Sequence, residues 1–151
     1  MASFDQKLRT LRLMEILLER TDDTHMLNAS ELCTILDREY GISTDRRTIY
    51  TEMEILDKFG LDIQQKKGKC PGYYIGARDF ELPELKLLVD AVQSSKFITE
   101  KKSKELIQKL EKLCCKTDAE MLSRYVFIVN RPKTENETVY YNVDYIHTAI
   151  Y

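Results

Sequence analysis

The feature that most restricts the fold is a pair of helix signatures joined by a very short turn around Gly41. Asn28 and Glu31 stand three residues apart in the order of a capping box, which predicts a helix over about residues 29–39. Gly41 suits the left-handed conformation that ends such a helix, and Asp45 is a good N-cap for the next one. Two helices joined by a tight glycine-containing turn form the helix-turn-helix pattern.

A further helix is predicted upstream, over about residues 6–20, because apolar side chains recur there at helical spacing. Gly60 ends the helix that follows the turn. The inner face of that third helix is predicted to consist of Ile49, Met53 and Leu56.

The pattern changes after Gly60 from helical to alternating. Residues 61–63 and 73–75 alternate as strands do, and the segment QQKKGKCPG between them contains two glycines and a proline that favour a turn. A hairpin directly after the third helix is a wing. The expected fold class is mainly α with a small β-hairpin: a winged helix-turn-helix over residues 1–78.

Residues 79–151 are predicted to form a helical linker or dimerisation unit with a short strand. Pro83 fits the first turn of a helix that runs to about Phe97, with its apolar face made of Leu85, Leu88, Val89 and Val92. Thr99 caps the next helix, which reaches about residue 115. In that helix Leu106, Leu110 and Leu113 are predicted to face inward, with Glu105 and Lys109 as a surface pair.

The remaining segments are predicted to be a strand and the start of a helix. YVFIVN, residues 125–130, has the length and β-rich content of a buried strand. Asn142 is a possible cap for a last helix, with Val143, Ile146 and Ile150 on one side. Because this amphipathic pattern stops after two turns, we expect a longer natural protein with a further C-terminal domain.

The outward surface of the third helix has the side chains of a DNA-reading surface. With the apolar face turned inward, Arg46, Arg47, Tyr50, Thr51 and Glu54 project from the rest of the helix. Arginine can fork onto guanine in the major groove, threonine can touch a thymine methyl, and tyrosine can bind a phosphate oxygen.

Arg46 and Arg47 stand in the first helical turn, where the helix dipole disfavours cations. Residues that break a local rule without a visible compensation indicate a functional position, and a phosphate backbone would supply the compensation. The alternative is that both arginines pair with Asp45 or Glu52 on a solvated face.

Lys66, Lys67 and Lys69 cluster at the tip of the predicted wing, where they can reach phosphates of the adjoining minor groove. A lysine-rich hairpin tip also keeps a sheet edge soluble, so the cluster alone does not decide between the two roles.

The overall charge of −2 is unusual for a nucleic-acid binder, so the position of the cations must carry the prediction. No apolar run at the N-terminus fits a signal peptide or a membrane span, which predicts a cytoplasmic protein with cysteines kept as thiols. Four cysteines without ligand spacing and two distant histidines favour neither a zinc site nor an enzyme. We therefore expect no cofactor and no metal.

At RRTIY, residues 46–50, the sequence resembles the WYL-domain transcriptional regulators with a DeoR-type winged helix-turn-helix head. The matching pieces are LRLMEILLERTD, DRRTIYTEMEIL followed by FGLDI, GYYIG, FELPELKLLVDAVQSSKFI and YYNVDYIHTAI. The resemblance covers nearly the whole chain and includes a segment outside the DNA-binding head.

The resemblance implies a homodimeric repressor or activator that binds double-stranded DNA, with an effector bound by a further C-terminal WYL domain. It places Arg46, Arg47, Thr48 and Tyr50 at DNA-facing positions. The acidic residues Glu52, Glu54 and Asp57 depart from a strongly basic recognition helix. The competing hypothesis is a winged-helix module that binds another protein and does not read DNA directly.

Overall fold

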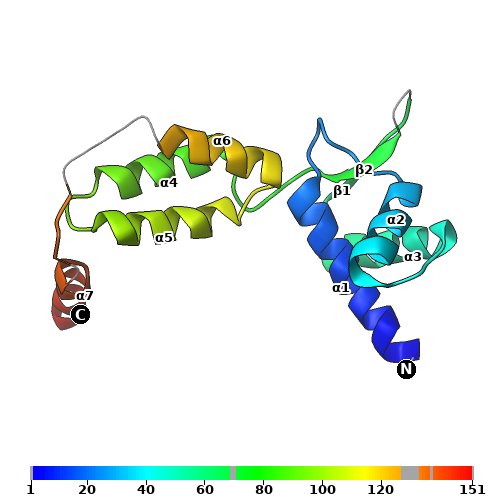
Figure 1. The fold of residues 1–151 in the computed structure, drawn as a ribbon, viewed down its shortest axis with the longest axis horizontal. Coiled ribbons are helices and arrows are strands. Elements are labelled where there is room, and N and C mark those ends of the chain that lie inside the picture. Colours follow the sequence, from blue (N-terminus) through cyan, green and yellow to red (C-terminus); the bar gives the residue numbers. More distant parts are fainter. Residues whose placement is uncertain (1, 69–70, 127–132, 137, 151) are drawn as a thin grey trace. The chain divides into compact units, whose positions relative to one another are not determined.

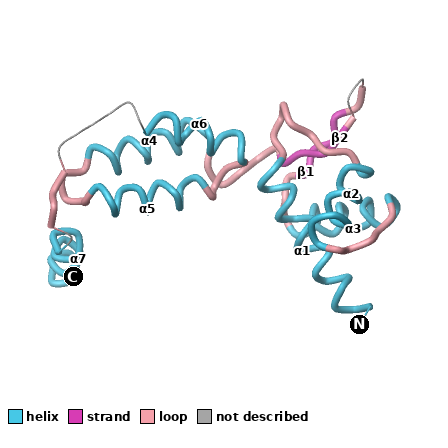
Figure 2. Tube along the Cα trace, in the orientation of Figure 1, coloured by secondary structure: helices cyan, strands magenta, loops and turns pink. Residues whose placement is uncertain are grey.

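The computed structural model describes residues 2–68, 71–126, 133–136 and 138–150. They belong to two compact units, Met1–Asp79 and Phe80–Tyr151. Helices dominate both units, and the described part contains one small antiparallel sheet of two strands (Figure 2). These features confirm a mainly helical fold with a small β-hairpin. No helix in the described ranges is long and apolar enough to cross a membrane.

The first unit consists of three helices and the hairpin, and the helices gather on one side of the hairpin (Figure 1). In chain order its elements are α1 (Ala2–Arg20), α2 (Ala29–Tyr40), α3 (Arg46–Phe59), β1 (Ile63–Lys66) and β2 (Gly72–Ile75). The three helices pack pairwise around one apolar core, which β2 closes. The core residues are Leu13, Ile16, Leu17, Ala29, Leu32, Leu36, Ile49, Met53, Leu56 and Ile75.

The ends of α2 are those that the sequence predicts. The side-chain oxygen of Asn28 accepts hydrogen bonds from the N–H groups of Ser30 and Glu31 at 2.9 and 3.0 Å. The Glu31 carboxylate in turn accepts from the Asn28 N–H at 2.7 Å, which completes the capping box. Gly41 ends the helix with a φ of 66°, a left-handed conformation that glycine adopts without strain.

The hairpin is fixed to the helices by backbone contacts that the sequence did not predict. Leu27, in the segment before α2, exchanges two backbone hydrogen bonds with Tyr73 of β2, at 3.1 and 2.8 Å. The two chains approach closely here, since a Cβ on Gly72 would lie 2.7 Å from the Met26 Cβ. Glycine at position 72 is therefore needed for this approach.

β2 confirms the predicted strand over residues 73–75, whereas the first strand is displaced from its predicted position. β1 begins at Ile63 and includes Gln64, Gln65 and Lys66, which the sequence placed in the loop, while residues 61–62 precede it. The register pairs Ile63 with Ile75 and Lys66 with Gly72. The three polar residues of β1 are all exposed, and because successive side chains of a strand point to opposite faces, water reaches both faces here; polarity alone therefore misled the prediction.

The second unit contains α4 (Leu82–Ser94), α5 (Glu100–Glu111), α6 (Lys116–Val126) and α7 (Thr138–Ile150). The first three of these helices pack against one another. Their buried core consists of Leu85, Val89, Ile107, Cys114 and Leu122. As predicted, Thr99 caps α5, since its hydroxyl accepts from the Lys102 N–H at 3.2 Å.

Four predictions for α4 and α5 are wrong. α4 ends at Ser94, before Phe97, and α5 ends at Glu111, short of the predicted residue 115. The inward face of α5 is centred on Ile107, whereas Leu113 is 43% exposed. Glu105 forms its ion pair with Lys102, one turn before it, at 3.3 Å. The predicted partner was Lys109, one turn after it.

The predicted strand over residues 125–130 is also corrected. Its first two residues belong to α6, a helix that the sequence analysis missed, and residues 127–130 lie outside the described residues. Leu122 is fully buried in α6. Packing of the helix on α4 and α5 outweighs the β-rich composition at its end.

The last helix begins four residues before the predicted cap. α7 starts at Thr138, so Asn142 lies within it. Asn136 provides the local hydrogen bonds instead, because its side-chain oxygen accepts from the Thr138 N–H at 2.9 Å and from the Thr138 hydroxyl at 2.7 Å.

Candidate nucleic-acid interface

α3 begins where the predicted cap places it. Asp45 precedes the helix in an extended conformation, and its carboxylate accepts from the Thr48 N–H at 2.8 Å and the Thr48 hydroxyl at 3.2 Å. The backbone hydrogen bond from Thr48 is the main reason that the pKa of Asp45 is lowered, and the positive charge of Arg47 contributes. The first helical turn therefore starts with Arg46 and Arg47.

Both arginines are exposed, and neither makes an ion pair with a residue that the structure describes. The alternative partner Glu52 is turned to the opposite side of α3. Its side chain is 2% exposed and accepts from the Arg9 Nη2 at 2.7 Å and Nε at 3.1 Å. The hydroxyl of Thr10 donates to the second Glu52 oxygen.

The outward side of α3 carries one continuous row of polar side chains. Arg47, Thr51 and Glu54 are all exposed, opposite the buried Ile49 and Met53. Their spacing of four and three residues places them one above another on a helix. The Thr51 hydroxyl donates to the Arg47 carbonyl at 3.2 Å. The hydroxyl is therefore turned toward the helix backbone, and the Thr51 methyl points away from that carbonyl.

Thr48 and Tyr50 lie beside this row. Thr48 is half-buried and its hydroxyl is used in the Asp45 cap. Tyr50 is 47% exposed, and its ring packs against Tyr73 of β2 with the centroids 6.3 Å apart and the planes tilted by 52°. Tyr50 therefore joins α3 to the hairpin as well as reaching solvent.

The hairpin carries two of the three predicted lysines among its described residues. Lys66 is the last residue of β1, and Lys67 follows it in the turn. Both are exposed, and neither forms an ion pair within the described ranges. Lys69, the third predicted lysine, lies outside the described residues. Next to them, Gln65 Nε2 donates to the Tyr73 hydroxyl at 3.2 Å, and partial burial with Tyr50 nearby raises the pKa of Tyr73.

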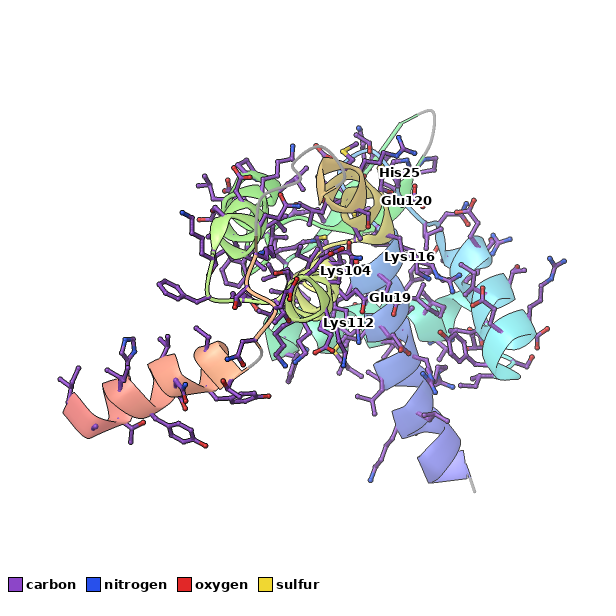
Figure 3. The ribbon with its side chains drawn as sticks, turned by 60° about the vertical axis from the view of Figure 1, so that its left-hand side comes forward. Glu19, His25, Lys104, Lys112, Lys116 and Glu120 are labelled. Carbon is purple, nitrogen blue, oxygen red and sulfur yellow. The ribbon has the colours of Figure 1, made fainter. Side chains whose placement is uncertain are left out.

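Two features of the first unit were not found from the sequence. Ile55 and Phe59 of α3 are 47% and 75% exposed, and their i, i+4 spacing was the available signal. His25 lies in the exposed loop after α1, where Figure 3 labels it. Its Nδ1 is 2.9 Å from the Asp22 carboxylate. The order Asp-x-Thr-His is the signal for this turn.

The arrangement offers cationic, hydroxyl and carboxylate groups on a helix and an adjoining hairpin, which suits recognition of a polyanion with hydrogen-bonding edges. In the described part of the chain, no group of three or more His, Cys, Asp or Glu side chains could hold a metal ion. Comparison with family models, curated proteins and solved structures finds no match for the chain. The resemblance to WYL-domain regulators therefore stays a prediction.

Proposed function

We propose that the chain is a sequence-specific double-stranded DNA-binding transcriptional regulator, with a winged helix-turn-helix over residues 1–78. The observation that carries the proposal is the exposure of Arg46 and Arg47 in the first turn of α3, without an ion pair to a described residue. Cations at a helix start generally cost roughly 0.3–1 kcal/mol each. The N-cap carboxylate of Asp45 interacts with the charge of Arg47, and a DNA backbone supplies further negative charge at this helix start.

The placement of α3 supports major-groove binding. Its buried side is held by the core and by Arg9, while the row of Arg47, Thr51 and Glu54 faces solvent. A helix of this kind lies in the major groove with its N-terminal residues at base edges. Lys66, Lys67 and Lys69 of the wing then bind phosphates beside the adjoining minor groove.

The burial of Glu52 answers an objection to DNA binding, namely that the acids of α3 would repel phosphates. The sequence of α3 contains as many acids as bases, but Glu52 is inside the unit and paired with Arg9. The surface offered to DNA is thus less acidic than the sequence of the helix. Dimerisation doubles the number of phosphate contacts, and we propose a homodimer that reads two half-sites about 34 Å apart.

We also propose that the chain belongs to the WYL-domain regulators, as the resemblance of RRTIY and its flanking segments predicts. Such a regulator works in the cytoplasm and binds an effector through a further domain. The proposal assigns the role of DNA-binding head to the compact unit Met1–Asp79. Its function does not require a catalytic residue or a cofactor.

Fluorescence anisotropy with duplexes selected from a random pool tests DNA binding. We expect salt-sensitive binding by the wild-type chain and a loss of more than about tenfold in the Arg46→Glu/Arg47→Glu variant, because two cations on the surface that faces DNA become acids that the phosphates repel. The matched control is Lys109→Glu/Lys112→Glu, which makes the same charge change on exposed lysines of the second unit. Equal losses in both variants, or no salt-sensitive binding at all, contradict the proposal.

A second candidate function, binding of a protein partner through α3, is favoured by the exposed Ile55 and Phe59. Apolar side chains that lie together on a surface commonly mark protein contacts. This candidate predicts that Phe59→Ser abolishes cellular activity while DNA binding by the purified chain is unchanged. If Arg46→Glu/Arg47→Glu loses its cellular activity while Phe59→Ser stays active, the result supports DNA reading instead.

A further inference from the structure

Glu54 is an exposed acid in the middle of the surface that α3 offers to DNA. It follows Arg47 by seven residues and Thr51 by three, on the same side of the helix. Lys58 is exposed one turn later, but neither side chain makes an ion pair with a residue in the described ranges. The carboxylate is thus free to meet a ligand.

An acid at this position opposes binding to a polyanion unless it accepts a hydrogen bond there. The neighbouring acid Glu52 avoids the problem because it is buried beside Arg9 and Thr10. Glu54 is not buried in this way, since its side chain lies on the outward row. Repulsion from phosphates therefore has to be offset by a donor on the DNA.

We infer that Glu54 is a specificity-determining residue that accepts a hydrogen bond from the N4 amino group of a cytosine in the major groove. Cytosine presents this donor without an acceptor on the same base, whereas adenine places the N7 acceptor beside its N6 donor, and guanine and thymine present acceptors. The inference rests on the proposed function, because it assumes that α3 lies in the major groove.

The spacing of the row adds a positional expectation. Seven residues of α-helix extend about 10 Å, which corresponds to about three base steps of 3.4 Å. A guanine contacted by Arg47 and the cytosine contacted by Glu54 should then be about three steps apart, with a thymine methyl near Thr51 between them. The half-site therefore contains these contacts within a short segment.

Selection of bound duplexes from a random pool, followed by competition binding, tests this role with the full chain. The wild-type chain is compared with Glu54→Gln, Glu54→Ala and the control Asp57→Asn, which removes the charge of the neighbouring exposed acid one turn later on α3. We expect the wild-type chain to prefer cytosine at one position by at least about fivefold. Glu54→Gln should shift that preference to adenine, because glutamine pairs with adenine N6 and N7.

Glu54→Ala should lose the preference at this position only, and should bind random duplexes more tightly than the wild-type chain because one repulsive charge is gone. Asp57→Asn should keep the cytosine preference. An unchanged base preference in both Glu54 variants overturns the role of Glu54 while DNA binding stands. A wild-type chain that selects no duplex overturns the proposed function itself.

Discussion

Arg9 of α1 and Glu52 of α3, which are 43 residues apart in the sequence, form an ion pair of 2.7 Å. The Glu52 side chain is 2% exposed and that of Arg9 is 16% exposed, so water screens the pair only weakly. Thr10 donates a further hydrogen bond to the same carboxylate. The pair fixes the back of α3 to α1 and thereby sets which side of α3 faces solvent.

Arg9→Met should destabilise the first unit by about 3 kcal/mol, because it leaves the buried Glu52 carboxylate without its cation. The double variant Arg9→Met/Glu52→Leu should recover much of this loss, since an apolar pair carries no desolvation cost. Urea unfolding followed by circular dichroism measures both changes. Lys7→Met, an exposed cation on the same helix, is the control. A double variant less stable than Arg9→Met contradicts this account of the pair.

Gly41 ends α2 with a left-handed backbone, with φ at 66°. Gly41→Ala should lower the free energy of unfolding by about 1–2 kcal/mol, because a Cβ disfavours this conformation. Gly41→Asn should cost less, since asparagine tolerates it best among the other residues. Thermal unfolding compares the two. No atom lies within 4 Å of a Cβ at this position, so a clash cannot explain the loss. Equal stability of both variants would argue against a backbone origin.

Local signals in the sequence were sufficient for the helix ends of the first unit. The Asn28 and Glu31 box, the Asp45 cap and the Gly41 turn each depend on residues within a few positions, so their chemistry is visible without the fold. The exposure of Arg46 and Arg47 followed from the same boundaries. Helix period then separated the inner face from the outer one.

Features that depend on distant contacts could not be predicted in this way. Glu52 was counted among the acids of the outer surface, because its partner Arg9 is remote in the sequence. α6 was missed for the same reason: Leu122 is buried by α4 and α5, while the local composition of its last residues favours a strand. Pairing with β2 likewise made Gln64 and Gln65 part of a strand despite their polarity.

Asp22 should make the stability of the first unit depend on pH. Partial burial raises the pKa of this carboxyl, but hydrogen bonds from Thr24 and His25 outweigh it and hold the pKa well below its usual value. A lowered pKa in the folded state stabilises the fold above the unfolded-state pKa of about 3.9. That stability is lost as the pH falls below this value.

The comparison of wild type with Asp22→Asn in urea unfolding at a series of pH values measures this effect. The wild-type chain should be the more stable at pH 7, and the difference should shrink below about pH 4, where the unfolded aspartate takes up a proton. Asp23→Asn, a change at the exposed neighbouring acid, should leave the profile unchanged. A difference that stays constant down to pH 3 would mean that the charge of Asp22 is not involved.

Arg47 and Lys67 should affect DNA binding in two different ways. Arg47 stands on the outward row of α3, whereas Lys67 lies in the turn of the hairpin, away from that row. Arg47→Ala should weaken binding to a selected duplex more than to a random one, because a guanine contact is lost. Lys67→Ala should weaken both duplexes equally and reduce the slope of log affinity against log salt by about 0.9, because one phosphate contact is lost. Anisotropy titrations at several salt concentrations separate these effects. If the two variants change sequence preference alike, α3 and the hairpin do not divide base reading and phosphate binding between them.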